Sequence, residues 1–319
     1  MIPLDEIRRA AERIAPHVHR TPIFSSRYLG EPSGASVFLK CESFQKTGSF
    51  KPRGALNKVL SLAEEERRRG LVTVSAGNHA QAVAWAARRT GVPCAVVMPA
   101  KASPLKIAAV EGYGARVVPH GDNATLFDRL RELQEETGYA FVHPFDDPTV
   151  LAGAGTAGLE IADDLPNVTV VVVPVGGGGL MGGVASAVRQ ACPRARIYAV
   201  ELEEGPGLGP ALAAGKPVPV ARPMGTLADG LIPPFVGQLP LDIAREAVDA
   251  VVTVSEAEIR QAMRALLVRA KLYVEGGGAA ATAALMAGKI PAGKDDVVAV
   301  LVSGGNVDPA RFPFAESPA

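Results

Sequence analysis

Cysteine is scarce in this chain of 319 residues, and its positions argue against several kinds of site. Cys41, Cys94 and Cys192 lie far apart in the sequence and form no CxxC pair. Such spacing excludes a disulfide scaffold and gives no zinc-binding pattern, so no metal is predicted. Scattered single cysteines are typical of reduced thiols in a cytoplasmic protein.

Net charge is also absent, because 33 lysine and arginine residues balance 33 aspartate and glutamate residues. Nucleic-acid binders and proteins that bind acidic membrane surfaces usually carry an excess of basic residues, so neither class is predicted. Residues 1–6 contain no basic stretch leading into an apolar run, and no segment approaches the ~20 apolar residues of a membrane-spanning helix. We therefore expect a cytoplasmic protein with no membrane or nucleic-acid partner.

Alternating strand and helix patterns are what the sequence does contain. Short β-branched runs recur, and several are apolar at successive positions, which is typical of strands covered on both faces of a parallel sheet. Amphipathic stretches separate them, so we expect an α/β fold of mainly parallel sheets flanked by helices. The predicted strands are Ser36–Cys41, Leu71–Val74, Cys94–Met98, Ala115–Val118, Ala140–Val142, Val168–Val173, Ile197–Val200, Ala250–Val254 and Val297–Val302. The predicted helices include Ala80–Thr90, Pro104–Tyr113, Thr125–Thr137, Gly179–Gln190 and Glu256–Ala270.

Two candidate boundaries divide these elements into domains. We expect a small α/β domain over residues 52–144, inserted into a large domain formed by residues 1–51 and 145–319. Residues 205–238 are rich in proline and glycine and are expected to be mostly irregular. Ligands in such folds bind beyond the C-terminal ends of the strands, so the residues that follow each strand are the candidates for a site.

Lys51 stands at a predicted helix start, in the sequence SFKPRG. Ser49 suits an N-cap, and Pro52 suits the first turn. The positive N-terminus of a helix disfavours an ammonium group, so a neutral amine, which can bond to a carbonyl carbon, is easier to reach there. A surface lysine at a helix start would explain the same residues unless the chain also binds a carbonyl compound.

A glycine loop follows the predicted strand Val168–Val173 and leads through Leu180 into a helix. Glycine backbone can wrap an anion, and its N–H groups add to those of the helix N-terminus. The loop lacks the GK[ST] ending of a nucleotide-binding loop and the acidic partner of a dinucleotide fold, so a small phosphate monoester is the expected ligand. A flexible turn would also use glycine. The loop consists of Gly176, Gly177, Gly178 and Gly179.

Two polar loops follow other predicted strands. Residues 75–79 (Ser-Ala-Gly-Asn-His) offer donors for a carboxylate or a phenolic oxygen, although serine and asparagine are also common N-caps. His79 is a possible base, without an identifiable serine or aspartate partner. The hydroxyl of Ser303 could bind a neutral ring nitrogen, or it could belong to an ordinary turn. Residues 275–278 (Glu-Gly-Gly-Gly) suit either a close approach to a ligand or a packed helix start.

Together these segments resemble the fold-type II pyridoxal-phosphate enzymes, and more narrowly the catabolic-type threonine/serine dehydratases. The resemblance runs from Arg20 to Asn306, and its motifs occur in the family's order. These motifs are SFKPRGALNK, SAGNHAQAVA, HGDN at residues 120–123, PFDDP at 144–148, AGAGT at 152–156, PVGGGGL, GTLADG at 225–230, and VEGGGA.

The resemblance implies pyridoxal 5'-phosphate as cofactor, bound by the large domain, and places its contacts by position. Lys51 would form the Schiff base and then act as the base toward the Cα proton of the substrate. The other implied cofactor contacts are Phe50 beside the ring, Asn78 at the 3-hydroxyl, Gly176 to Gly179 with Leu180 at the phosphate, and Ser303 at the ring nitrogen. The implied substrate loop contains Ser75, Ala76, Gly77 and His79. The implied reaction is β-elimination from L-threonine, with L-serine as a second substrate.

Three departures from related enzymes narrow this expectation. Serine racemases carry, at the position of Ala76, a serine that acts as a second acid/base, so efficient racemisation is not expected. Glu201 fits the first ligand of a racemase cation site, but residues 205–207 supply no aspartate, so no metal is predicted. The chain ends soon after Ser303, and a C-terminal regulatory domain is not expected.

Alternative functions remain open at this point. A serine racemase or a 3-hydroxyaspartate dehydratase would share the fold. A non-catalytic sensor could bind a small phosphorylated metabolite through the glycine loop. Relatives suggest a homodimer or homotetramer.

Overall fold

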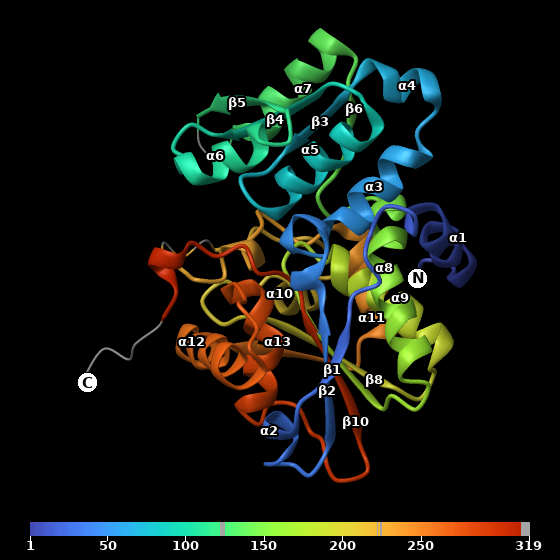
Figure 1. The fold of residues 1–319 in the computed structure, drawn as a ribbon, viewed down its shortest axis with the longest axis vertical. Helices are drawn as coiled ribbons and strands as arrows, with labels where there is room; N and C mark the ends of the chain where they lie inside the picture. Colours follow the sequence, from blue (N-terminus) through green and yellow to red (C-terminus); the bar gives the residue numbers. More distant parts are fainter. Residues whose placement is uncertain (122–124, 222, 224, 314–319) are drawn as a thin grey trace.

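The chain folds around two separate β-sheets, which form the upper and lower lobes in Figure 1. The computed structural model describes residues 1–121, 125–221, 223 and 225–313. Its strands are β1 (Ile23–Ser25), β2 (Ser36–Cys41), β3 (Leu71–Val74), β4 (Cys94–Pro99), β5 (Arg116–His120), β6 (Ala140–Phe141), β7 (Val170–Pro174), β8 (Arg196–Leu202), β9 (Ala250–Val254) and β10 (Val297–Val302). Its α-helices are α1 (Leu4–Ile14), α2 (Arg27–Gly30), α3 (Lys51–Ser61), α4 (Glu64–Arg69), α5 (Asn78–Thr90), α6 (Pro104–Glu111), α7 (Leu126–Thr137), α8 (Pro148–Asp164), α9 (Gly179–Ala191), α10 (Leu208–Ala214), α11 (Gln238–Ala247), α12 (Glu256–Ala265) and α13 (Gly276–Met286).

The larger sheet, in the lower lobe, has the strand order β1-β2-β10-β7-β8-β9. β1 is antiparallel to β2, and all other neighbouring strands are parallel. The inner strand β7 is buried along its whole length. Val170 and Val172 join one hydrophobic core while Val171 and Val173 join another, because successive side chains of a strand point to opposite faces. The continuous apolar run therefore reflects burial on both faces.

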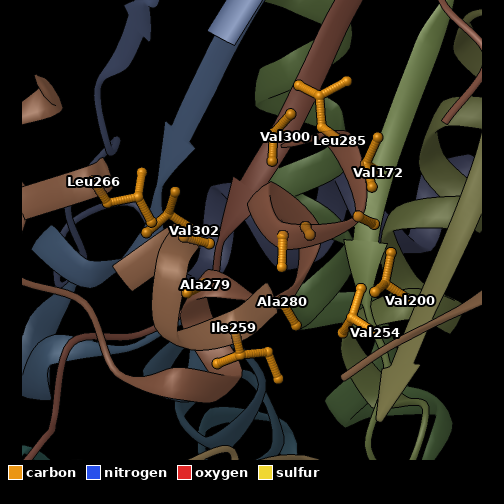
Figure 2. Close-up of a cluster of buried hydrophobic side chains, with 14 of the residues drawn as sticks. Val172, Val200, Val254, Ile259, Leu266, Ala279, Ala280, Leu285, Val300 and Val302 are labelled. Carbon is orange, nitrogen blue, oxygen red and sulfur yellow. The ribbon is translucent and has the colours of Figure 1, made fainter. Parts of the chain in front are cut away.

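Helices cover both faces of this larger sheet. On one face α13 contributes Ala279 and Ala280 to the same core as Val172 and Val300, as Figure 2 shows. On the other face α1, α8, α9 and α11 contribute to the second core. The predicted arrangement, a mainly parallel sheet between two helical layers, is confirmed.

The smaller sheet, in the upper lobe, has the strand order β5-β4-β3-β6 and is parallel throughout. The four residues of β3 are all buried. α5 and α3 share a core with one face of this sheet, and α7 packs on the other face. The first residue of α5, Asn78, follows the C-terminal end of β3 by only a short loop.

α3 connects the two lobes, because it contacts α5 in the upper lobe and α8 in the lower lobe (Figure 1). Glycine allows α3 and α8 to approach closely. A Cβ atom on Gly54 would lie 2.7 Å from the carbonyl oxygen of Val150, and one on Gly153 would lie 2.4 Å from that of Arg53. The start of α3 is thus held tightly against the lower lobe.

A buried ion network anchors α3 at the same place. The guanidinium of Arg53 donates to Glu42 at 2.7 Å and to Glu160 at 2.7 Å, and the amine of Lys40 donates to Glu160 at 2.5 Å. Burial alone lowers the pKa of Arg53, but the carboxylates outweigh burial and the pKa is raised. The two cations and the two carboxylates balance, so the network as a whole carries no net charge.

Several local predictions differ from the structure. The strand β1 was not predicted, and the stretch expected to be irregular, residues 205–238, contains α10. The helix predicted over residues 256–270 is α-helical only as far as Ala265 and continues as a π-helix over Leu266–Ala270. Residues 122 and 123 of the HGDN motif lie outside the described residues. The domain bounds remain a prediction.

Within the described ranges, no helix has both the length and the apolar character needed to cross a bilayer.

Candidate functional site

Lys51 is the first residue of α3, and Pro52 lies in the first turn, as predicted. Its Nζ donates a hydrogen bond to the backbone carbonyl of Pro144 at 2.7 Å and lies 5.1 Å from the centre of the Phe50 ring. Burial lowers the pKa of Lys51 to about 8. The cause of this lowered pKa is desolvation, and not the helix N-terminus that the sequence indicates.

The segment before Lys51 pairs with the segment after β10. Ser49 forms an antiparallel bridge with Gly304, and the N–H of Phe50 donates to the carbonyl oxygen of Ser303 at 3.1 Å. The N-cap of α3 is Phe50, so the prediction that Ser49 caps this helix is wrong. Ser49 is extended, with φ −159° and ψ 166°, because its backbone takes part in the bridge. The pairing places Lys51 next to the Ser303 segment.

The Ser303 side chain is buried at this junction. Its hydroxyl donates to the carbonyl oxygen of Gly277 at 3.4 Å. This hydrogen bond is long, so the hydroxyl can be redirected toward a better acceptor. A Cβ atom on Gly278 would lie 2.2 Å from the carbonyl oxygen of Gly304, so close packing of the α13 start accounts for that glycine without a ligand.

Asn78, the first residue of α5, is held by hydrogen bonds on both sides of its amide. Its Nδ2 donates to Oε1 of Glu275 at 2.6 Å, and its Oδ1 accepts from Nδ2 of Asn306 at 2.8 Å. Asn306 also donates to the carbonyl oxygen of Thr47 at 2.6 Å. These contacts join α5 of the upper lobe to the starts of α3 and α13.

The glycine loop ends at Gly178, the N-cap of α9, and Gly179 and Leu180 open the helix. Gly178 has φ +91°, a left-handed conformation that glycine adopts readily. No side chain of the described protein caps this helix start. Because the first N–H groups of a helix lack partners within it, they are free to bind an anion here.

Phe145 packs against the glycine loop from the turn after β6. A Cβ atom on Gly177 would lie 2.2 Å from the Phe145 ring, and one on Gly176 would lie 2.8 Å from the carbonyl oxygen of Gly230. Packing therefore requires glycine at both positions. The conformation of the loop is therefore fixed by its contacts with Phe145 and Gly230, unlike that of a flexible turn.

The loop from Ser75 to His79 shapes the other side of the site. The Ser75 hydroxyl accepts from the N–H of Gly77 at 3.1 Å, and a Cβ atom on Gly77 would meet no atom within 4 Å. Ala76 is partly buried beside it. The Nε2 of His79 lies 2.9 Å from the carbonyl oxygen of Val142, and burial lowers the pKa of His79 well below its usual value. The imidazole is neutral and donates through Nε2, and the role of His79 as a base stays a prediction.

His143 belongs to the site but was missed by the sequence argument. Its Nδ1 accepts from the N–H groups of Phe145 at 3.2 Å and Asp146 at 2.7 Å. These bonds shape the turn whose Pro144 carbonyl binds Lys51. His143 comes directly after the predicted strand Ala140–Val142 and two residues after the end of β6, so the rule that ligands bind after strand ends could have identified it.

Glu201 has a structural use that needs no cation. Its carboxylate accepts from the N–H groups of Gly207 at 2.8 Å, Leu208 at 2.6 Å and Gly209 at 3.0 Å. It thus caps the N-terminus of α10. In the part of the chain that the structure describes, no group of three or more His, Cys, Asp or Glu side chains could hold a metal ion.

The donors of the site suit a ligand with several functional groups. The Lys51 amine can bond to a carbonyl carbon, and the start of α9 can bind a phosphate. One hydrogen of the Asn78 amide is left for an acceptor, and the Ser303 hydroxyl can reach a ring nitrogen. The residues present therefore fit pyridoxal 5'-phosphate.

Comparison with known proteins gives matches over nearly the whole chain. Residues 14–304 match the family model described as pyridoxal-phosphate dependent enzyme. The L-threonine ammonia-lyase of Thermotoga maritima is 45% identical over 313 residues, covering 97% of this chain and 76% of that relative. A solved threonine deaminase from T.th. has a TM-score of 0.87 and 43% identity, with 96% of this chain and 98% of that chain covered. The maize serine racemase has a TM-score of 0.91 and 38% identity, with 96% and 94% covered.

Proposed function

The chain belongs to the family of pyridoxal-phosphate dependent enzymes, and we propose that it converts L-threonine to 2-oxobutanoate and ammonia. L-Serine, which would give pyruvate, is the proposed second substrate. The observation that carries the proposal is the Lys51 amine, whose pKa is about 8 and which lies beside the Ser303 segment. The name of the 45% identical Thermotoga relative supports the choice of substrate.

Each part of the cofactor has a proposed partner in this chain. Lys51 would hold the carbonyl carbon, the Asn78 amide the 3-oxygen, and Ser303 the ring nitrogen. The N–H groups from Gly176 to Leu180 would hold the phosphate. Phe50, whose ring lies near the Lys51 amine, would pack beside the pyridine ring. When bound, the cofactor withdraws electrons from the Cα–H bond of an attached amino acid.

Lys51 then serves as the base that takes the Cα proton at Nζ. A pKa of about 8, instead of 10.5, makes the neutral fraction of the amine near pH 7 roughly 300-fold larger. The Pro144 carbonyl orients the amine by accepting one of its hydrogens. A base that is both neutral and oriented suits proton removal at neutral pH.

The reaction balances without an external oxidant or reductant. Lys51 takes the Cα proton, and the Cβ–O bond breaks with its electron pair on oxygen, which takes a proton from solvent and leaves as water. Lys51 later returns its proton to solvent, so no net proton is consumed. Loss of water leaves an unsaturated amino acid, an enamine. Its hydrolysis consumes one water and releases ammonia. The net products from threonine are one 2-oxobutanoate and one ammonia.

Ser303 would favour prompt elimination. A serine hydroxyl can share a hydrogen bond with a neutral ring nitrogen, whereas an aspartate there would keep the nitrogen protonated. A neutral ring withdraws electrons less strongly, so prompt loss of the β-hydroxyl is expected.

Serine racemisation is the second candidate, because the maize serine racemase is similar over 96% of this chain. Ala76 argues against it. Its methyl group offers no proton donor or base, so the residue that related racemases use for a second proton transfer is missing. Dehydration of 3-hydroxyaspartate, by an enzyme of the same fold, is a further candidate that the assay includes.

The test is a product assay on the cofactor-loaded protein with L-threonine, L-serine and 3-hydroxyaspartate. We expect 2-oxobutanoate from threonine, pyruvate from serine, and little D-serine by chiral analysis. Dominant D-serine formation, or turnover of hydroxyaspartate alone, would contradict the proposal. Light scattering of the same sample tests the proposed homodimer or homotetramer, and limited proteolysis tests the proposed small domain, residues 52–144.

A further inference from the structure

Glu275 has no part in the mechanism above, yet it lies at the centre of the polar contacts of the site. It precedes α13, and two N–H donors converge on its carboxylate. One is Nδ2 of Asn78, which donates to Oε1 at 2.6 Å, and the other is the backbone N–H of Asn306, which faces the carboxylate and lowers its pKa. A Cβ atom on Gly304 would lie 2.4 Å from the same Oε1, so the carboxylate also packs against the Ser303 segment.

These contacts determine which way the Asn78 amide points. Asn306 uses its Nδ2 hydrogens on two acceptors, the carbonyl oxygen of Thr47 and Oδ1 of Asn78. Rotating the Asn78 amide by half a turn would place its NH₂ group against the NH₂ group of Asn306, and its oxygen against the carboxylate of Glu275. Both contacts would be repulsive, so Glu275 and Asn306 select one orientation.

In the selected orientation the Asn78 amide has one hydrogen left. Its oxygen accepts from Asn306, and one Nδ2 hydrogen goes to Glu275. The remaining hydrogen can only donate, so the ligand atom that it meets must be an acceptor. The 3-oxygen of the cofactor meets this requirement when it is ionised.

We propose that Glu275 is a positioning residue for the cofactor, which holds the Asn78 amide so that an N–H group faces the 3-oxygen. This inference rests on the proposed contact between Asn78 and the cofactor, but not on the identity of the substrate. The same hydrogen bond joins α5 of the upper lobe to the start of α13 in the lower lobe, so Glu275 also fixes the position of the loop from Ser75 to Asn78.

The protonation state of Glu275 would modulate this contact near neutral pH. The pKa of Glu275 is raised to about 7, mainly by burial and in smaller part by the charge of Asp229, while the hydrogen bond from Asn78, the charge of Lys106 and the N–H of Asn306 lower the pKa and offset part of this rise. Lys106 and Asp229 form an ion pair at 2.8 Å, which reduces the net charge that faces the carboxyl. An ionised carboxylate accepts both N–H donors, whereas a protonated carboxyl turns one oxygen into a donor. The hydrogen bonding between the Asn78 amide and Glu275 therefore strengthens as pH rises through about 7.

The test compares wild type with Glu275→Ala and Glu275→Gln, and Glu258→Gln serves as the control. Glu258 is a partly buried carboxylate paired with Lys289, away from these contacts. Apoprotein is titrated with pyridoxal 5'-phosphate, and the long-wavelength absorbance of the bound cofactor is compared with its near-ultraviolet absorbance. An N–H donor at the 3-oxygen favours the ionised form, which absorbs at longer wavelength.

For Glu275→Ala we expect cofactor affinity at least about tenfold weaker and a lower ratio of long-wavelength to near-ultraviolet absorbance. Glu275→Gln keeps the size of the side chain but offers one acceptor oxygen to two donors, so we expect a reduced ratio with unchanged thermal stability. In wild type the ratio should rise with pH through about 7, and in Glu275→Gln this step should be absent. Glu258→Gln should match wild type in both measurements.

Wild-type affinity and absorbance ratio in Glu275→Gln would overturn the proposal, even if Glu275→Ala fails to fold. A ratio in wild type that does not change across pH 7 would overturn the part that concerns ionisation. If threonine is not a substrate, the proposed function fails, but the cofactor titration still decides the role of Glu275.

Discussion

The Nζ of Lys51 donates a hydrogen bond to the backbone carbonyl of Pro144, at 2.7 Å. This bond connects α3 to the turn after β6, and the next residue of that turn, Phe145, packs against Gly177. The same short turn thus contacts both the Lys51 amine, which we propose as the catalytic base, and the loop proposed to bind phosphate. The relative position of these two parts of the site depends on the turn.

His143 should make the turn sensitive to acid. Burial lowers the pKa of His143 to about 4, and its unprotonated Nδ1 accepts two backbone N–H groups. The folded state therefore binds fewer protons than the unfolded state between about pH 6.5 and 4. This contribution to stability is complete above about pH 6.5 and is lost as pH falls toward 4.

We expect the free energy of unfolding to decrease by about 2–3 kcal/mol between about pH 7.5 and 4.5 through this group alone. Urea denaturation at both pH values should show a smaller decrease for His143→Asn, since asparagine offers an acceptor that does not titrate. Equal pH dependence in the two proteins would exclude His143 as the cause.

Gly177→Ala should weaken cofactor binding. The added Cβ atom would lie 2.2 Å from the Phe145 ring, so the glycine loop or the turn must shift. We expect at least about a tenfold loss of cofactor affinity, measured by titration of the apoprotein. Gly293→Ala is the matched control, because a Cβ atom there would meet nothing within 4 Å. Similar affinities for both variants would contradict the packing argument.

Gly77→Ala should weaken substrate binding without changing the stability of the fold. A Cβ atom on Gly77 would meet no atom within 4 Å, so the protein has room for the methyl group. If this loop surrounds the substrate carboxylate, the methyl group would occupy substrate space, and KM for threonine should rise about tenfold or more. The thermal unfolding temperature should stay close to that of wild type. An unchanged KM would remove Gly77 from the substrate loop.

Local patterns predicted much of this fold because the relevant interactions are local. β2, β3, β9 and β10 have the predicted bounds, since each is a β-branched or apolar run between turns. β1 has only three residues and gives too short a pattern to recognise. α10 lies in a stretch rich in proline and glycine, and part of its stabilisation comes from the carboxylate of Glu201, which lies outside the helix, in β8.

Contacts between distant segments explain what the sequence could not predict in the site. Ser49 has the side chain of an N-cap, but its bridge to Gly304 keeps it extended. Pro144 acts through a backbone carbonyl, which every residue has, so no residue type marks it. Glu275 and Asn78 are 197 positions apart, and only the fold reveals their hydrogen bond. The lysine and the glycine loop were recognisable because their chemistry depends on residue type.

The buried ion network near Lys51 should be essential for stability. Removing the guanidinium in Arg53→Met would leave the buried Glu42 and the partly buried Glu160 beside a single cation, Lys40. We expect a loss of about 3–5 kcal/mol in the free energy of unfolding, measured with denaturant. Arg68→Met breaks an exposed ion pair on α4 and should cost far less. Equal losses would show that the buried network is not what holds α3.

The most direct test of the account is the rate of 2-oxobutanoate formation from L-threonine by Lys51→Ala at saturating cofactor. Lys216→Ala, which changes an exposed lysine just after α10, is the control. We predict that Lys51→Ala loses turnover by at least about a thousandfold, because it lacks both the amine that binds the cofactor and the base, while Lys216→Ala stays near wild type. Turnover by Lys51→Ala at a rate close to that of wild type would contradict the central claim.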